Sequence, residues 1–198
     1  MRVALEFIPK DASRESLLDD VQEMEQMVTE ILETARLKSE YGQLNLQKTD
    51  LVKLIRDICI TFEGQIPGIR FENVPETFQT FVDTEQIETV LKNLLDNALK
   101  YSTVGNAPVE ICLKKSDAGT LIEIQDRGPG IQDEELDLIF EPFYRTDKSR
   151  NRKTGGYGLG LSLCKTIIEA HGGTIDVQSN TGKGTMFSLH LPKSTSTI

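Results

Sequence analysis

The sequence is poor in the residues that build disulfide frameworks and metal cages. Its 198 residues include three cysteines, two histidines and no tryptophan. The cysteines are odd in number and isolated within apolar stretches, so Cys59, Cys112 and Cys164 are predicted to be reduced core residues. His171 and His190 have no cysteine or histidine at metal-ligand spacing. We therefore expect neither a disulfide framework nor a zinc centre.

The chain also lacks an excess of basic residues and any long hydrophobic run. It has 22 Lys and Arg against 31 Asp and Glu, a formal net charge of −9, which disfavours nucleic acid as a partner because phosphate binding needs clustered cations. No run approaches the roughly 18 apolar residues of a membrane-spanning helix, and the first residues become polar too soon for a secretory signal. With 38% hydrophobic residues, we expect a soluble, globular, cytoplasmic chain.

The N-terminal part is predicted to be a fragment of a helical hairpin. Residues 1–8 have the spacing of the last turns of a helix with no capping residue before them, so we expect the chain to begin inside that helix. After a turn over 9–13, a long helix is predicted over 14–41, ended by Gly42. Its apolar residues alternate in steps of four and three: Leu17, Val21, Met24, Val28, Ile31 and Ala35. This spacing is typical of a coiled-coil or four-helix-bundle seam, and it equally fits one amphipathic helix packed on its own domain.

Residues 47–192 alternate helical and strand patterns. Asp50 and Asp83 are placed to cap helices over 51–62 and 84–101, and a third helix is predicted over 159–170. Strands are predicted over 69–73, 77–82, 109–114, 121–125, 174–179 and 185–191, with a short helix near 134–139. The pattern predicts an α+β protein, a two-layer α/β sandwich in which three helices cover one face of a mixed sheet. The helical hairpin fragment, residues 1–46, precedes it, and a polar tail, residues 193–198, follows.

Two segments combine polar side chains that suit an anionic ligand and a flat ring. In NLLDNALKYS, Asn93, Asn97 and Lys100 share one helical face, and amide oxygens are permitted Mg2+ ligands beside phosphate. In DRGPGI, Asp126 follows a strand and can accept a hydrogen bond from an exocyclic amine, while glycines let the backbone bend beside a ligand. Taken alone, the first segment also fits a solvated helix face, and the second an ordinary turn.

Two further segments supply positive charge and backbone amides. FEPFYRTDKSR begins a stretch, residues 140–156, with five basic and two acidic residues, in which Phe140 and Phe143 are expected to anchor the loop. A solvated charged loop is the alternative. GGYGLGLSL runs four glycines into a helix, and the amides at such a helix start bind phosphate. The spacing differs from the Rossmann and P-loop patterns, and the H-R-D and D-F-G segments of Ser/Thr/Tyr kinases are absent.

The order of these four segments resembles the catalytic and ATP-binding domain of bacterial sensor histidine kinases, which has the GHKL (Bergerat) fold. The resemblance covers about residues 48–192, and the preceding hairpin resembles the later part of that family's dimerisation and phosphoacceptor domain. It implies ATP and Mg2+ as cofactors, and a homodimeric parent protein anchored in the bacterial inner membrane. It also implies phosphate transfer to a histidine on a helix of its own or a partner subunit, and then to a response-regulator receiver domain.

Carried over residue by residue, the resemblance implies a complete site. Asn97 and Asn93 would bind the Mg·phosphate group, Lys100 the phosphate, and Tyr101 would lie beside the base or ribose. Asp126 would bind the adenine amino group, with Thr185 supporting it through a water. Residues 140–157 would form a lid that brings Arg145 and Arg150 to the terminal phosphate. The other residues expected at the nucleotide are Gly128, Gly130, Ile131, Phe143, Gly156, Tyr157, Gly158, Leu159, Gly160 and Leu161.

Two departures from the family pattern limit the expected activity. The phosphoacceptor segment of the family, similar to H-E-[LF]-R-T-P-L, is absent, and both histidines look like structural parts of the ATP-binding domain. Gyrase-like and chaperone-like relatives place a general-base Glu four residues before the Mg-binding Asn, where this sequence has Asn93, so hydrolysis should be slow. We expect a truncated protein-histidine kinase that binds Mg·ATP without phosphorylating itself. The alternative is an ATP-binding regulatory module or an anti-sigma-type serine kinase of the same fold.

Overall fold

The computed structural model describes residues 12–39, 43–102, 105, 107–116, 118–146 and 157–193. Several predictions fall outside these residues: the helix over 1–8, the cap at Gly42, and all but the first residue of the polar tail. In the part of the chain that is described, no helix is both long enough and apolar enough to cross a membrane.

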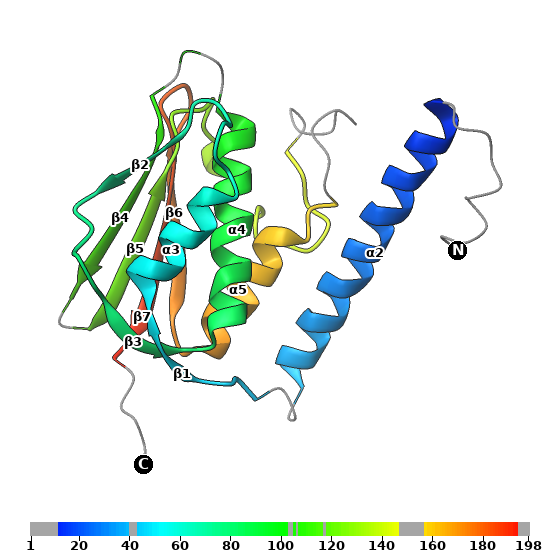
Figure 1. The fold of residues 1–198 in the computed structure, drawn as a ribbon. Coiled ribbons are helices and arrows are strands. Elements are labelled where there is room, and N and C mark those ends of the chain that lie inside the picture. Colours follow the sequence, from blue (N-terminus) through cyan, green and yellow to red (C-terminus); the bar gives the residue numbers. More distant parts are fainter. Residues whose placement is uncertain are drawn as a thin grey trace.

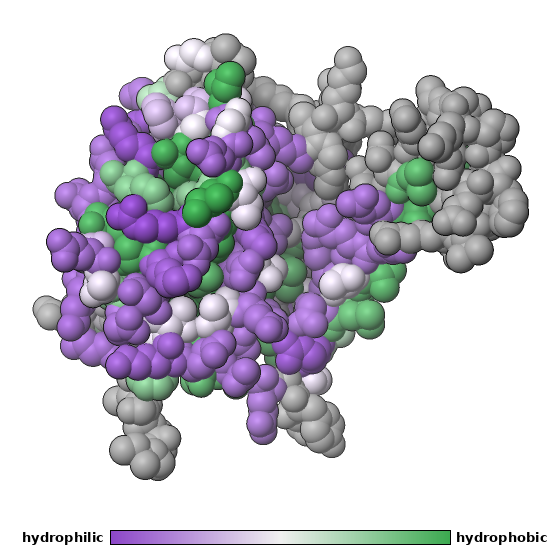
Figure 2. Space-filling view, in the orientation of Figure 1, coloured by the Kyte–Doolittle hydropathy of each residue, from purple (hydrophilic) through white to green (hydrophobic). Residues whose placement is uncertain are grey.

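The N-terminal helix α2 (Ala12–Lys38) packs against the α/β part of the chain with a face other than its heptad seam. It begins two residues before the predicted helix and ends three residues earlier. Leu37 is buried in the common core, whereas the seam positions Leu17, Met24, Val28 and Ile31 are 42–53% exposed. Val21 is the exception in the seam, since it is buried. Figure 2 shows hydrophobic side chains along the edge of α2 that faces away from the rest of the protein. Apart from Val21, the seam is therefore not the surface that α2 buries on its own chain.

The α/β part holds a mixed sheet, as predicted, but it contains five of the six predicted strands, because the strand predicted over 77–82 belongs to a separate sheet. The order of these five strands is β2-β4-β5-β7-β6, with only the β2–β4 pair parallel. The strands are β2 (Ile69–Glu72), β4 (Val109–Lys115), β5 (Gly119–Gln125), β6 (Thr174–Asn180) and β7 (Gly184–Pro192). The sequence prediction missed β1 (Gln47–Asp50), which pairs antiparallel with β3 (Gln79–Val82) in a separate two-stranded sheet. The strand QKTD has no apolar alternation, so its pattern gave no signal.

Three helices cover one face of the sheet (Figure 1): α3 (Leu51–Ile60), α4 (Thr84–Tyr101) and α5 (Gly160–Ala170). The two predicted caps are confirmed, since the Asp50 carboxylate accepts the Val52 amide and the Asp83 carboxylate accepts the Gln86 amide. The helix predicted over 134–139 is wrong in extent, because only a single 3-10 turn, η1 (Asp133–Glu135), forms there.

The core lies between α4 and the sheet. Fully buried side chains of α4 pack on strand residues that alternate inward along β4, β5 and β7. These include Ile87, Leu91, Leu94 and Leu95 from α4, and Ile111, Ile122, Ile124 and Leu189 from the sheet. The rigid unit that results holds α4 and the ends of β5 and β7 in fixed positions, and these elements carry most of the predicted site.

The three cysteines are free, but they are not all core residues. Cys164 is fully buried, and burial raises its pKa far above the ordinary value. Burial raises the pKa of Cys59 to about 11. Cys112 corrects the prediction, because it alternates to the face of the sheet that no helix of the described residues covers, where it is half-buried between Lys114 and Glu123.

Candidate functional site

A cavity of about 590 Å³ opens beside the C-terminal half of α4, and it collects most of the predicted site residues. Its walls come from α4, the end of β5, the segment 129–146, the start of α5 and the middle of α2. This volume lies in the range of pockets that hold a nucleotide-sized ligand. The predicted residues that line it are Asn93, Asn97, Lys100, Tyr101, Asp126, Gly130, Ile131, Arg145, Tyr157, Gly158, Gly160, Leu161 and Thr185.

The other predicted residues divide into two groups. Gly128, Phe143 and Leu159 are not part of the cavity lining, although each is a neighbour in sequence of a residue that is. Arg150 and Gly156 lie outside the described residues, so their predicted contacts with the phosphates remain predictions.

Asp126 is a buried carboxylate at the floor of the cavity, with only 6% of its surface exposed. Its Oδ1 accepts the backbone amides of Gly128 at 2.7 Å and Thr185 at 3.2 Å. Burial raises the pKa of Asp126, and these two hydrogen bonds oppose that rise. Because both amides donate to Oδ1, Oδ2 is left to accept a hydrogen bond from a ligand in the cavity.

Thr185 supports Asp126 through its backbone amide, and the water-mediated contact expected from the resemblance stays a prediction. The Thr185 backbone amide donates directly to the carboxylate, and its hydroxyl instead shares a 3.0 Å hydrogen bond with Ser179. Ser179 also accepts the amide of Ile131, so one hydroxyl network connects β6, β7 and the loop that follows Asp126. This network holds the strand ends and the loop that position the Asp126 carboxylate.

Gly128 shapes this corner without lining it. A Cβ at Gly128 would lie 2.7 Å from the Tyr101 carbonyl oxygen and 2.9 Å from the Asp126 carboxylate. Glycine is therefore required for the loop after β5 to pass between the end of α4 and the carboxylate. The sequence pattern indicated this need, and the structure supplies its steric reason.

The face of α4 presents Asn93, Asn97 and Lys100 to the cavity, as the helical spacing predicts. Asn93 donates its amide nitrogen to the Thr89 carbonyl at 3.1 Å, which turns its Oδ1 toward the start of α5. A Cβ at Gly160 would lie 2.6 Å from that oxygen, so a larger residue there would require the Asn93 side chain to move. Leu159, the residue before α5, makes no side-chain cap hydrogen bond, and the amides at such a helix start are groups that can bind phosphate.

These groups fit a magnesium nucleotide by their chemistry. Amide oxygens are hard donors that suit Mg2+, an ammonium group and uncapped helix amides suit phosphate, and a buried carboxylate suits an amine. Among the described residues there is no group of three or more His, Cys, Asp or Glu side chains that could hold a metal ion by themselves. A bound metal would therefore depend on amide and phosphate oxygens.

The two ends of the predicted lid meet beside the cavity. The Phe143 amide donates to the Gly158 carbonyl at 2.9 Å, and a Cβ at Gly158 would lie 2.4 Å from the Tyr144 carbonyl oxygen. Gly158 has φ +76°, a conformation that favours glycine. The predicted anchoring is correct for Phe140, whose ring packs edge-on against the ring of Phe187, with the two ring centroids 6.3 Å apart. It is wrong for the Phe143 ring, which is 60% exposed, so Phe143 contributes through its backbone.

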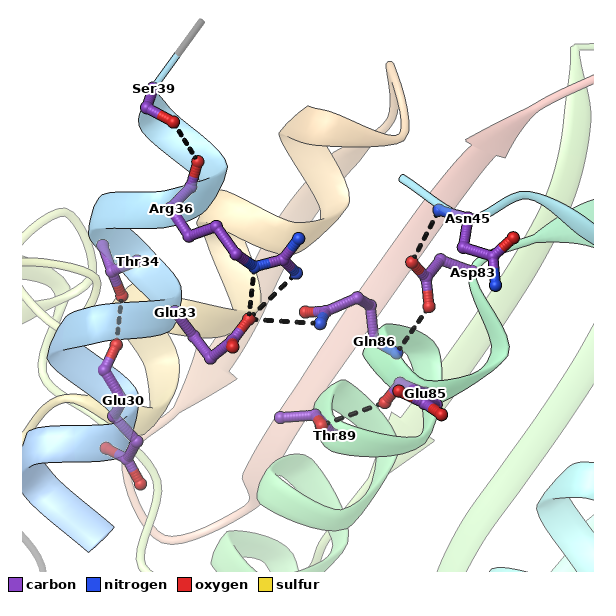
Figure 3. Close-up of polar contacts among 10 residues, drawn as sticks. All are labelled: Glu30, Glu33, Thr34, Arg36, Ser39, Asn45, Asp83, Glu85, Gln86 and Thr89. Carbon is purple, nitrogen blue, oxygen red and sulfur yellow. Dashed lines mark hydrogen bonds and ion pairs between the residues drawn. The ribbon is translucent and has the colours of Figure 1, made fainter. Parts of the chain in front are cut away.

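One wall of the cavity was not predicted, because it comes from α2. Gln26, Met27 and Glu30 line the cavity opposite the α/β part of the chain. Figure 3 shows how α2 is held there: the Glu33 carboxylate accepts the side-chain amide of Gln86 at 3.4 Å. These wall residues belong to no periodic apolar pattern and to no motif, so the sequence carried no signal for them.

Comparisons with known proteins agree with this geometry. Residues 82–195 match the family described as histidine kinase-, DNA gyrase B- and HSP90-like ATPases. The sensor protein SrrB of Staphylococcus aureus is 35% identical over 190 residues, which are 92% of this chain and 32% of SrrB. The chain thus spans about a third of the length of such curated relatives.

Solved structures with the same fold come from the same group of proteins. The histidine kinase AdeS of Acinetobacter baumannii aligns with a TM-score of 0.77 at 26% identity, covering 96% of this chain and 88% of AdeS. The full-length protein ShkA, solved in complex with AMPPNP, aligns with a TM-score of 0.75 at 25% identity over 97% of this chain and 41% of ShkA. Because the family match covers more than half of the sequence, this chain belongs to the histidine kinase-, DNA gyrase B- and HSP90-like ATPase family.

Proposed function

We propose that this chain is the ATP-binding and catalytic part of a sensor histidine kinase. The observation that carries the proposal is the convergence of the buried Asp126 carboxylate, the amide face of α4 and the uncapped start of α5 on one cavity. Each group alone fits several ligands. Together they match the amine, the metal-bound phosphates and the terminal phosphate of one nucleotide.

In the proposed complex, Oδ2 of Asp126 accepts a hydrogen bond from the adenine amino group. Asn97 and Asn93 hold the Mg2+ ion through their side-chain oxygens, and Lys100 neutralises phosphate charge. Mg2+, when bound, supplies charge neutralisation at the phosphates. Arg145 lines the cavity at the base of the lid, and with Arg150 it would position the terminal phosphate for an incoming imidazole nitrogen.

The proposed reaction moves the terminal phosphoryl group to a histidine that this sequence does not contain in a matching segment. The bond from phosphorus to the bridging oxygen of ADP breaks as a bond to the imidazole nitrogen forms. A response-regulator aspartate would receive the phosphoryl group afterwards. The exposed seam of α2 would pack against helices of a second copy, as in a four-helix bundle.

The test uses ATP labelled at the terminal phosphate. Incubated alone, this chain should bind the nucleotide and acquire no acid-labile label. With a separately prepared phosphoacceptor domain from a relative such as SrrB, acid-labile label should appear on the acceptor. Acid-stable label would instead support the serine-kinase alternative, and binding without any transfer would support the regulatory module. Acid-labile label on this chain alone would refute the expectation that it lacks an acceptor.

A further inference from the structure

The wall contributed by α2 brings a carboxylate into the nucleotide cavity from outside the ATPase fold. Glu30 is half-buried, lines the cavity, and accepts a hydrogen bond from the side-chain amide of Gln26 at 3.0 Å. The buried Leu37 and the Glu33–Gln86 hydrogen bond hold α2 against the domain at this level. Neither the family match, which begins at residue 82, nor the sequence motifs assign a role to Glu30.

Glu30 and Asn93 line the same cavity, and the charge of Glu30 acts on the helix that follows the lid. This negative charge acts on the buried thiol of Cys164 in α5 and contributes to the raised pKa of that group. The Cys164 thiol in turn contacts the Val90 carbonyl of α4 at 3.8 Å. Asn93 lies one helical turn beyond Val90. Glu30 therefore lines the cavity in which the proposed function puts the metal-bound phosphates.

Among the described residues, the lining of the cavity has more acidic than basic side chains, and most of the basic residues of the predicted lid, Arg150 among them, lie outside those residues. The described lining carries four carboxyl groups, on Glu30, Asp96, Asp126 and Glu135, against two basic side chains, on Lys100 and Arg145. A polyanion entering such a cavity is repelled unless a cation accompanies it. Metal-free ATP carries about two more negative charges than its Mg2+ complex. The carboxylates of the cavity therefore repel the metal-free form more strongly than the complex.

We propose that Glu30 is a specificity-determining residue that makes the cavity select metal-loaded ATP over metal-free ATP. This proposal rests on the proposed function, because it assumes that the cavity binds ATP with phosphates toward Asn93. Glu30 differs from the other three carboxyl groups in its origin on α2. The selectivity is consequently a property of the docked arrangement of α2, and not of the ATPase fold alone.

Calorimetric titration of this chain tests the proposal with two ligands, ATP with excess Mg2+ and ATP with a chelator. Glu30→Gln should tighten the binding of metal-free ATP by about fivefold, while the Kd of Mg·ATP changes by less than about twofold. Glu30→Lys should lower the Kd of metal-free ATP further, because it replaces the negative charge at this position by a positive one. The matched controls are Asp20→Asn and Asp20→Lys, which make the same charge changes at an exposed position of α2 that does not line the cavity.

Each outcome has a separate meaning. If the unaltered chain does not bind Mg·ATP, the proposed function fails. If it binds Mg·ATP but the two Glu30 variants leave the ratio of the two Kd values unchanged, only the role of Glu30 is refuted. A shift of equal size in the Asp20 variants would refute it as well, since the effect would then come from net charge rather than from the cavity wall.

Discussion

Replacing Asp126 by asparagine tests the centre of the proposed nucleotide site with almost no change in shape. The asparagine side chain retains one oxygen, which can still accept the backbone amides of Gly128 and Thr185. Its nitrogen then takes the place of Oδ2 and presents a donor to the adenine amino group, which is also a donor. The substitution thus removes the contact with the base and keeps the contacts with the protein.

The expected loss follows from the kind of hydrogen bond involved. A buried hydrogen bond to a charged group contributes about 1.5–3 kcal/mol, which corresponds to a rise in Kd of roughly 10- to 150-fold. Asp126 is 6% exposed, so solvent screening reduces this contribution little. The substitution also relieves the cost of burying a carboxylate, so the folded state should not be destabilised strongly.

Calorimetric titration of Mg·ATP into both forms measures the change directly. Asp176→Asn is the matched control, because it makes the same chemical change on a strand at an exposed carboxylate, on the opposite face of the sheet from α4. Thermal unfolding should show that Asp126→Asn remains folded. Equal Kd values for the two forms, with both folded, would refute the assignment of Asp126 to the adenine amino group.

Three further predictions concern the lid, a buried histidine and the seam of α2. Gly158→Ala should abolish measurable nucleotide binding in calorimetry while circular dichroism stays unchanged, because its Cβ would meet the Tyr144 carbonyl at 2.4 Å. Burial lowers the pKa of His171, whose Nε2 accepts the Asp83 amide, so its contribution to stability is full above the ordinary pKa of 6.5 and is lost as pH falls through the lower pKa of the folded state. Urea unfolding between about pH 8 and pH 5 measures this loss, and His171→Gln should flatten the dependence. Val28→Lys should shift any dimer to monomer in light scattering, because this seam residue is 53% exposed in the single chain.

The sequence predicted the elements of the α/β part well where local physics decides them. The helix predicted over 84–101 has those bounds in the structure, because Asp83 caps its start and an uninterrupted apolar face follows. The strand β1 escaped prediction for the opposite reason. β1 is fixed by a partner distant in sequence, through the pairing of Gln47 with Val82, and it has no apolar period of its own.

The site was predictable where one element carries several of its residues. Asn93, Asn97 and Lys100 lie one and two turns apart, so helical spacing alone places them on a common face. The direct amide contact from Thr185 to Asp126 was not predictable, since it depends on which atom β7 presents at the end of β5. Residue types and order thus indicate the ligand, whereas the hydrogen bonds that orient each group depend on the sheet register.

Helix α2 shows most clearly why an amphipathic pattern reveals only part of what a helix does. Its heptad seam is conspicuous because apolar residues repeat along it, yet most of those positions, Val21 excepted, remain exposed in this chain. The face that α2 presents to the ATPase fold includes Met27, Glu30 and Leu37, a mixture of types with no clear period. The face of α2 toward the ATPase fold and the seam lie on different sides of the helix. α2 can therefore contact the nucleotide cavity and a second copy at the same time. A displacement of α2 within a helical bundle would therefore change the charge of the cavity wall.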